Sequence, residues 1–546
     1  MASFPSGINN GGLRRATGTT LAALWIAMAG AQGVSAQSLE LTAYKQAVAE
    51  AISEDEGLAA FYRERGFAAI WTDPEDSAAA ERRSALLEAI EGGQVHGLPV
   101  SRYDEDGLIA RMRNVTSERA RGELEILLSR TFLKYAHDIQ SGILVPTRVD
   151  SGIKRKAPVR ESRGLLEALV AGNPREVIRD LAPRTPEYAR LMREKLTLEH
   201  LIAHGGWGEP VVSGKMEPGQ SGPNVVALRD RLIAMDYLPA SLSASYDEAM
   251  RAAVASFQED HGLEADGIAG TSTLTEINVG PEDRLKSVVV AMERERWLNL
   301  PEGRGKRHVW VNLTDFHATI VDDGKVTFET RSVVGHQDAD RRTPEFSDTM
   351  EFMVVNPSWY VPRSIVVNEY LPQLRRNPGA AGHLEITDSR GRQVNRSNGF
   401  SQYSAASFPF AMRQPPGPRN ALGLVKFMFP NQYNIYLHDT PSKSLFDQTR
   451  RTYSHGCIRL GDPQDFAYAL LARQTDDPVG LFQSRLRSGA ESRINLEQPI
   501  PVHLVYRTAF TKAKGHVNYR QDMYGRDAKL WNALSAAGVA LIAGQS

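Results

Sequence analysis

The stretch Ser454-His455-Gly456-Cys457-Ile458-Arg459 contains the only cysteine of the 546-residue chain. A thiol with an ordinary pKa near 8.5 is mostly protonated at neutral pH, so nucleophilic attack requires a nearby base or positive charge. His455 lies two residues from Cys457, on the same side if the segment is extended. Gly456 allows the backbone to approach an acyl group, and the neighbouring amide N–H groups would hold an oxyanion. The stretch therefore predicts a cysteine nucleophile.

A second histidine, His438, ends a predicted strand and is separated from Ser454 by a gap of fifteen residues. This position would let it face Cys457 as a general base. A lone cysteine is also compatible with a buried free thiol or with an intermolecular partner. Zinc bound by two histidines and one cysteine is a further alternative, but the sequence has no other thiol and no His-Glu-x-x-His motif. We expect neither a metal nor a cofactor.

The sequence around this cysteine predicts mainly β structure. Alternating hydrophobic residues indicate strands at 308–313, 318–321, 326–331 and 351–355. Residues from about 358 to 425 are irregular and rich in proline, which indicates an insertion over the β domain, with a lid as one interpretation. We expect a β domain at 305–490, with the insertion at about 358–425, and a C-terminal segment at 491–546.

The preceding part of the chain predicts helices. Residues 38–205 carry apolar residues at helical spacing and no catalytic cluster, which favours a scaffold. A stretch rich in Gly, Pro and Ser follows, and residues 218–280 then show three helical patterns around a turn at 266–271. A generic helical bundle is the alternative for 218–280.

Composition and the N-terminus narrow the class of protein. There are 64 Lys and Arg against 65 Asp and Glu, which gives no electrostatic argument for nucleic acid as a partner. Arg14 and Arg15, an apolar stretch at 21–31 and the small residues at 34–36 are typical of a secretory signal peptide. We expect residues 1–36 to be removed and the rest to be exported and soluble. An uncleaved N-terminal anchor is the alternative.

His438 and the Ser454-His455-Gly456-Cys457-x-Arg459 motif resemble the L,D-transpeptidase catalytic domain, called YkuD-like, and the likeness extends to the large periplasmic L,D-transpeptidases of Gram-negative bacteria. Residues 218–280 resemble a peptidoglycan-binding module with three helices, and 38–205 resemble a scaffold domain. The implied fold is multidomain α+β: a helical scaffold, the three-helix module and a mainly-β catalytic domain with a capping insertion. Further resembling segments are Trp359-x-x-Pro362-x-Ser364-Ile365, Arg413-Gln414-Pro415-Pro416-Gly417-Pro418-x-Asn420-x-Leu422-Gly423 and Tyr436-Leu437-His438-Asp439-Thr440-Pro441.

The resemblance implies a role for each matching residue. Cys457 is the nucleophile and His438 the general base, and the other implied catalytic residues, around the oxyanion, are Ser454, His455 and Gly456. The implied substrate-binding residues are Arg459, Tyr436, Asp439, Thr440, Trp359 and Asn420. Many smaller family members have glycine where this chain has Asp439, whereas the larger periplasmic members share the aspartate.

The resemblance also implies a reaction. Cys457 would attack the third residue of a tetrapeptide stem in peptidoglycan, release the terminal D-Ala and hold the acyl group as a thioester for a second stem amine. The product is a 3→3 cross-link, which would place the protein in cell-wall biogenesis and cell shape, in the periplasm, as a carbapenem target. Alternatives are an L,D-carboxypeptidase, attachment of an outer-membrane protein to peptidoglycan, and a binding protein with a decayed catalytic domain. The oligomeric state stays open.

Overall fold

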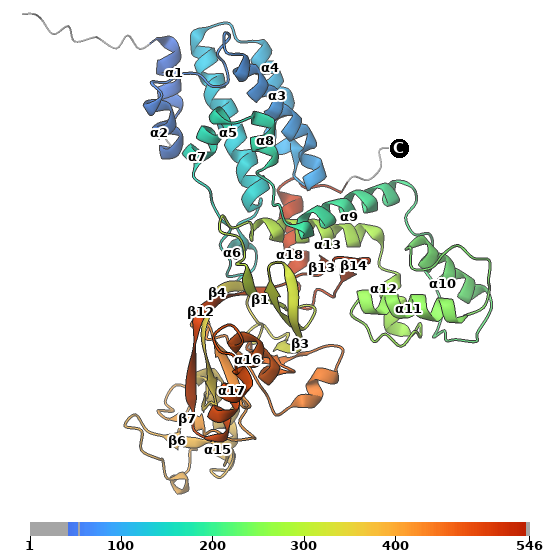
Figure 1. The fold of residues 1–546 in the computed structure, drawn as a ribbon, viewed down its shortest axis with the longest axis vertical. Coiled ribbons are helices and arrows are strands. Elements are labelled where there is room, and N and C mark those ends of the chain that lie inside the picture. Colours follow the sequence, from blue (N-terminus) through green and yellow to red (C-terminus); the bar gives the residue numbers. More distant parts are fainter. Residues whose placement is uncertain (1–41, 53–54, 542–546) are drawn as a thin grey trace, which may run out of the picture. The chain divides into compact units, whose positions relative to one another are not determined.

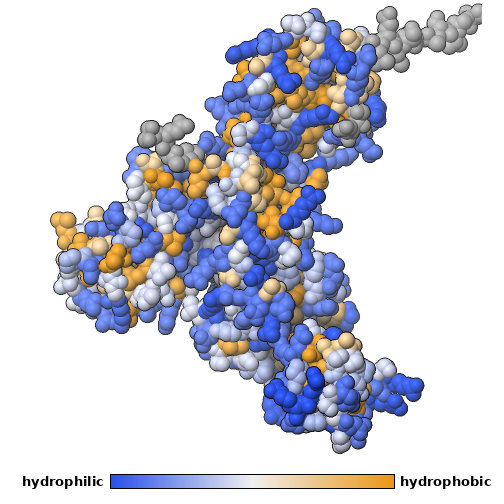
Figure 2. All heavy atoms as spheres, turned by 180° about the vertical axis from the view of Figure 1, so that it is seen from behind, coloured by the Kyte–Doolittle hydropathy of each residue, from blue (hydrophilic) through white to orange (hydrophobic). Residues whose placement is uncertain are grey.

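The computed structural model describes residues 42–52 and 55–541, so the expected signal peptide at 1–36 lies outside the described residues. Helices predominate up to Arg296 and strands from Arg307 onward, which confirms the expected α+β class (Figure 1). No helix in the described ranges is both long and apolar enough to cross a bilayer. The face seen in Figure 2 is mostly hydrophilic, with apolar residues in separate groups.

The first helical region is organised around its longest helix, α5. Ser117 begins α5 by accepting a hydrogen bond from the Ala120 amide, and Phe132 is fully buried in its core. Glu125 of α5 is also fully buried and binds the turn that follows α2. The helices are α1 (Ala43–Ala51), α2 (Glu56–Glu64), α3 (Ser77–Glu91), α4 (Glu105–Arg113), α5 (Glu118–Ser141), α6 (Pro146–Val149), α7 (Ser162–Ala171), α8 (Pro174–Arg179) and α9 (Pro186–Ala203).

The second helical region contains the three expected helices, α10 (Pro223–Ala234), α11 (Glu248–Asp260) and α12 (Thr271–Ile277). Their apolar faces meet in one core. The buried Gln258 amide holds the turn before α12: its Nε2 donates to the Ile268 carbonyl, and its Oε1 accepts from the Gly267 amide. A single side chain therefore closes the turn that the sequence predicts at 266–271.

The β domain is built on one large sheet. Its strand order is β10-β3-β11-β9-β8-β4-β12-β1-β2, and β2 also pairs with β3, so all of these strands except β10 form a closed ring. Closure leaves these strands without free edges, and their inner side chains form one hydrophobic core. The strands are β1 (Arg307–Asn312), β2 (His317–Asp322), β3 (Lys325–Gly335), β4 (Phe346–Val355), β8 (Val425–Met428), β9 (Leu437–His438), β10 (Thr452–Ser454), β11 (Ile458–Leu460) and β12 (Ser492–Val505).

The sheet continues past the expected domain end at residue 490. Strand β12 lies between β4 and β1, antiparallel to the first and parallel to the second. Because β12 is central in the sheet, the β domain extends to Val505. Helices α16 (Pro463–Leu471) and α17 (Pro478–Arg487) contribute Phe466 and Phe482 to the same core.

The insertion at about 358–425 is more regular than its proline content indicated. It has its own three-stranded sheet of β5 (Trp359–Tyr360), β7 (Ala411–Gln414) and β6 (Glu385–Thr387), with α14 (Arg363–Ile365), the π-helical turn η3 (Val366–Tyr370) and α15 (Leu371–Arg376). A separate hydrophobic cluster stabilises it. The sequence pattern missed these strands because each has four residues or fewer, too short to show alternation.

The remaining elements join the helical and β regions. Helix α13 (Pro281–Arg296) ends in four buried charged residues, Glu293 to Arg296. One of them, Arg294, pairs with Asp527 of the C-terminal segment. That segment contains β13 (Ala509–Thr511), β14 (Val517–Tyr519) and α18 (Arg526–Ala536).

Candidate active site

Strands β9 and β11 bring the two halves of the expected site together. They are parallel neighbours, with His438 opposite Arg459 and Leu437 opposite Ile458, and the Ile458 amide donates to the Tyr436 carbonyl at 3.1 Å. Because side chains alternate along a strand, Leu437 and Ile458 share the core face, where both are fully buried. The opposite face receives His438 and Arg459, and extending the register by one residue adds Tyr436 and Cys457.

His438 is held as a neutral base. Its ring is buried and its Nδ1 donates a hydrogen bond to the backbone carbonyl of Asp439 at 2.5 Å. Since a carbonyl oxygen can only accept, the proton of the neutral ring lies on Nδ1, and the lone pair on Nε2 is available. Burial, aided by the positive charge of Arg459, lowers the pKa of His438 to about 3.

Cys457 is a half-buried free thiol. Burial raises its pKa to about 11, while hydrogen bonds with Tyr436 and the charge of Arg459 act in the opposite direction. Its Sγ donates to the Asn434 carbonyl at 3.5 Å. These pKa shifts favour a neutral thiol and a neutral imidazole, and no hydrogen bond joins the two groups within the described residues.

Ser454 and Gly456 shape the turn before Cys457. The Ser454 hydroxyl donates to the Cys457 carbonyl at 2.5 Å and accepts from the Gly456 amide at 3.1 Å. Gly456 has φ of 114°, a left-handed conformation that favours glycine, and an added Cβ would lie 3.2 Å from Ile435 Cδ1. Its amide is thus occupied, whereas the Cys457 amide has no partner among the described residues. Of the two amides, the Cys457 N–H is the one free to bind an oxyanion.

His455 has a partner that the sequence did not indicate. Its Nε2 lies 2.5 Å from Oε1 of Glu369, a residue of the insertion, and the same carboxylate oxygen is 3.3 Å from Nη2 of Arg341. The His455 side chain is exposed and connects the turn before Cys457 to the insertion. Sequence reasoning missed Glu369 and Arg341 because neither lies in a recognisable motif.

Three of the expected substrate-binding residues are buried and hydrogen-bonded within the chain. Asp439 accepts from the Thr440 and Leu424 amides, at 2.7 and 2.9 Å, and pairs with Lys443 Nζ at 2.8 Å. Thr440 Oγ1 accepts from an amide two residues later. Asn420 donates to the Pro415 carbonyl and accepts from an amide two residues on. These contacts give the three residues a role in shaping the loops around the site.

The remaining expected substrate-binding residues differ in position. Tyr436 and Arg459 lie on the face of the sheet that carries Cys457, and the Tyr436 ring is 5.6 Å from the His438 ring. Arg459 Nε is buried with no hydrogen-bond partner among the described atoms. Trp359 is in the insertion, half-buried against Tyr370.

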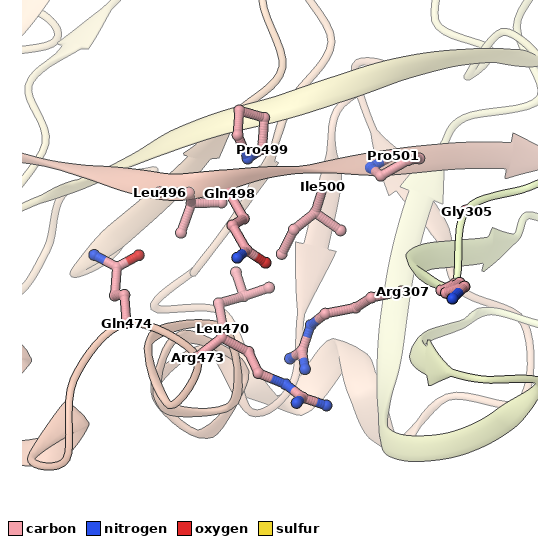
Figure 3. A pocket seen from close by; sticks show the side chains of 11 residues that line it. Gly305, Arg307, Leu470, Arg473, Gln474, Leu496, Gln498, Pro499, Ile500 and Pro501 are labelled. Atoms are coloured by element: carbon pink, nitrogen blue, oxygen red, sulfur yellow. The ribbon is translucent and has the colours of Figure 1, made fainter.

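A cavity of about 310 Å³ lies elsewhere in the β domain, among β1, α16 and β12 (Figure 3). Arg307 and Arg473 line it and both pair with Asp322, and its apolar wall includes Leu470 and Leu496. None of the expected catalytic residues lines this cavity.

The protonation state of Cys457 leads to a pH prediction. Because its pKa is raised to about 11, the thiolate fraction of the folded protein should rise about tenfold per pH unit between pH 7 and 10. The alkylation rate with iodoacetamide should follow, and the lone cysteine makes whole-protein mass spectrometry a direct readout. The control is the urea-unfolded chain, whose rate should level off above about pH 8.5. A folded-state rate that levels off at or below that pH would contradict the assignment.

Comparison with protein-family models gives three matches. The L,D-transpeptidase catalytic domain matches residues 306–479, the scaffold domain matches 56–194, and the "Putative peptidoglycan binding domain" matches 221–277. A protein of Haemophilus influenzae named "Putative L,D-transpeptidase" is 30% identical over 247 residues, which are 44% of this chain and 48% of that protein. The match thus spans about half the length of this relative.

The solved structures that are similar to this chain include two L,D-transpeptidases. An L,D-transpeptidase from Xylanimonas cellulosilytica is 16% identical, with 54% of this chain and 100% of that chain covered and a TM-score of 0.17. Another from Stackebrandtia nassauensis is 15% identical, with 55% and 97% covered and a TM-score of 0.21. From the family matches, we conclude that the chain carries an L,D-transpeptidase catalytic domain, joined to a scaffold domain and a peptidoglycan-binding domain.

Proposed function

We propose that the chain is an L,D-transpeptidase that forms 3→3 cross-links in peptidoglycan through a thioester on Cys457. The observation that carries the proposal is the pairing of β9 with β11. When its register is extended by one residue, Cys457 and His438 lie on the same face of the sheet. The Nε2 lone pair of His438 has no hydrogen-bond partner within the described residues. The match to a peptidoglycan-binding domain supports peptidoglycan as the substrate. We further propose export to the periplasm.

In the first half-reaction, Cys457 Sγ attacks the carbonyl carbon of the third stem residue while its proton passes to His438 Nε2. The Cys457 amide stabilises the oxyanion. The C–N bond to the terminal D-Ala then breaks, and His438 returns the proton to the departing amine. A thioester remains on Cys457 and the imidazole is neutral again, as its lowered pKa requires.

In the second half-reaction, an amine of another stem peptide attacks the thioester carbon. A new amide bond forms, the C–S bond breaks, and a proton of the amine passes through His438 to the thiolate. One amide is exchanged for another, so no external energy source is needed. Water in place of the amine would give an L,D-carboxypeptidase.

The test is incubation of the full chain with disaccharide-tetrapeptide, with products read by mass spectrometry. We expect a cross-linked dimer that has lost one D-Ala, with one free D-Ala released per cross-link. The control substrate is disaccharide-tripeptide alone, which has no terminal D-Ala to release and should give no dimer.

Three different outcomes would each replace the proposal. Tripeptide without dimer would indicate carboxypeptidase activity. Acyl transfer only to a lysine-bearing protein or peptide would favour protein attachment. Absence of all three products, together with absence of a carbapenem adduct on Cys457, would refute thioester chemistry and favour a binding protein.

A further inference from the structure

The carbonyl group of Gly456 is held by a residue outside the catalytic motif. Thr343, in the loop between β3 and β4, donates its hydroxyl hydrogen to the Gly456 carbonyl at 2.7 Å. The same Oγ1 accepts from the Gly335 amide at 2.9 Å, and Thr343 is fully buried. Its one hydroxyl therefore ties the end of β3 to the turn that precedes Cys457.

The Gly456 carbonyl and the Cys457 N–H belong to the same peptide unit. In a planar trans peptide these two groups point in opposite directions, so fixing one fixes the other. Gly456 has a left-handed φ and no Cβ, so steric contacts within the turn do not by themselves fix the orientation of this peptide unit. Ser454 holds the two flanking peptide units, and the hydrogen bond from Thr343 is the direct constraint on the unit that carries the Cys457 N–H.

Thr343 is in turn held by the C-terminal segment. Arg526, which is fully buried, donates from Nη2 to the Thr343 carbonyl at 2.9 Å and from Nη1 to Glu345 at 3.2 Å. The Tyr524 hydroxyl donates to the Gly335 carbonyl at 2.6 Å. Residues after 520 therefore hold Thr343 itself and the Gly335 end of its bridge.

The scaffold region contacts the same place. The Lys154 amide donates to the Glu345 carbonyl at 2.8 Å, and the Glu345 amide donates to the Gly152 carbonyl at 2.9 Å. Nε of Arg526 lies 3.7 Å from the Asp150 carboxylate. The loop that carries Thr343 is thus bound by two parts of the chain that lie outside the matched catalytic domain at 306–479.

We propose that Thr343 is a positioning residue that aims the Cys457 amide at the oxyanion, and that Tyr524 and Arg526 hold it in place. This inference rests on the proposed function, because it assumes acyl transfer through Cys457. It assigns the C-terminal segment an indirect part in catalysis, through Thr343. The face that carries Cys457 and His438 belongs to β9 and β11, not to that segment.

The test compares Thr343→Val, which keeps the shape but lacks the hydroxyl, with Thr343→Ser, which keeps the hydroxyl. We expect Thr343→Val to lower the maximal rate of acylation of Cys457 by imipenem about ten- to a hundredfold, because an oxyanion donor is misdirected. Thr343→Ser should remain within about threefold of the wild-type rate, since the donor is retained.

The second readout is alkylation of Cys457 by iodoacetamide, which forms no oxyanion. Its rate should stay within about twofold in both variants, since the thiol and His438 are unchanged. A general structural disturbance would slow both reactions, and that result would overturn the inference. An unchanged acylation rate in Thr343→Val, or failure of Thr343→Ser to restore it, would also overturn it.

Tyr524→Phe provides an independent variant if Thr343→Val does not fold. It removes the hydroxyl that binds the Gly335 carbonyl and should slow acylation selectively, by about two- to tenfold. Equal rates for Tyr524→Phe and the wild type would count against the inference. The wild-type chain is measured first: if it forms neither an acyl adduct with imipenem nor a product from disaccharide-tetrapeptide, the proposed function fails, whatever the variants do.

Discussion

Replacing Cys457 by alanine is expected to lower the rate of cross-link formation by about 10⁵-fold or more, to the background of the assay. No second thiol is available to replace it, because Cys457 is the only cysteine of the chain. The mass adduct with a carbapenem should disappear as well. Both readouts are taken from the same sample by mass spectrometry, and a product that persists in Cys457→Ala would refute the nucleophile.

His438→Gln is compared with Cys457→Ala, because it removes the proposed base and leaves the Cys457 thiol in place. Acylation at pH 7 should fall about 10²- to 10⁴-fold. The loss should shrink as the pH rises toward the Cys457 pKa of about 11, since thiolate then forms without a base. A loss that stays constant up to pH 10 would mean that His438 does not act by removing the proton.

Replacing Glu125 by alanine is expected to lower the free energy of unfolding of the first helical region by about 4 kcal/mol. The carboxylate is fully buried and accepts from the Tyr62 hydroxyl, from the amides of Ile70, Trp71 and Thr72, and from the Thr72 hydroxyl. Removing it leaves these donors buried without an acceptor. Urea unfolding followed by far-ultraviolet circular dichroism should show a transition at a lower urea concentration.

The matched control is Glu123→Ala on the same helix. The Glu123 side chain is 55% exposed and, within the described ranges, pairs with Arg119 alone, so its loss should change stability by about 0.5 kcal/mol or less. Equal effects of the two substitutions would show that the buried hydrogen bonds of Glu125 do not stabilise this region. Loss of stability in Glu125→Ala alone would show that they do.

Local sequence patterns were sufficient to predict the main elements of the fold and to select the central residues of the candidate site. The alternation of His438 with Leu437, and of Cys457 with Ile458, predicts which side chains share a face once two strands pair. The need for glycine at 456 follows from the same short stretch. Helices α10 to α12 and the turn at 266–271 were likewise predicted, because helical spacing and turn residues act over a few positions.

The partners of the site could not be predicted in this way. His455 was expected beside the oxyanion, yet it contacts Glu369, which lies 86 positions earlier in the chain. Asp439 and Asn420 were expected to bind substrate, but the structure uses their polar atoms to hold loops. A motif states which residue types are present and says nothing of the contacts that they make with distant segments.

The sequence by itself thus determined the candidate nucleophile, its candidate base and the order of helical and β regions, because these depend on residue chemistry and on spacing within a few positions. Only the tertiary structure decided the direction in which the two pKa values move, since burial in the folded chain raises the pKa of Cys457 and lowers that of His438. It also decided that Thr343 and Arg526 support the Gly456–Cys457 turn. Those contacts join residues 113 and 183 positions apart, and they exist only because the folded chain brings these distant segments together.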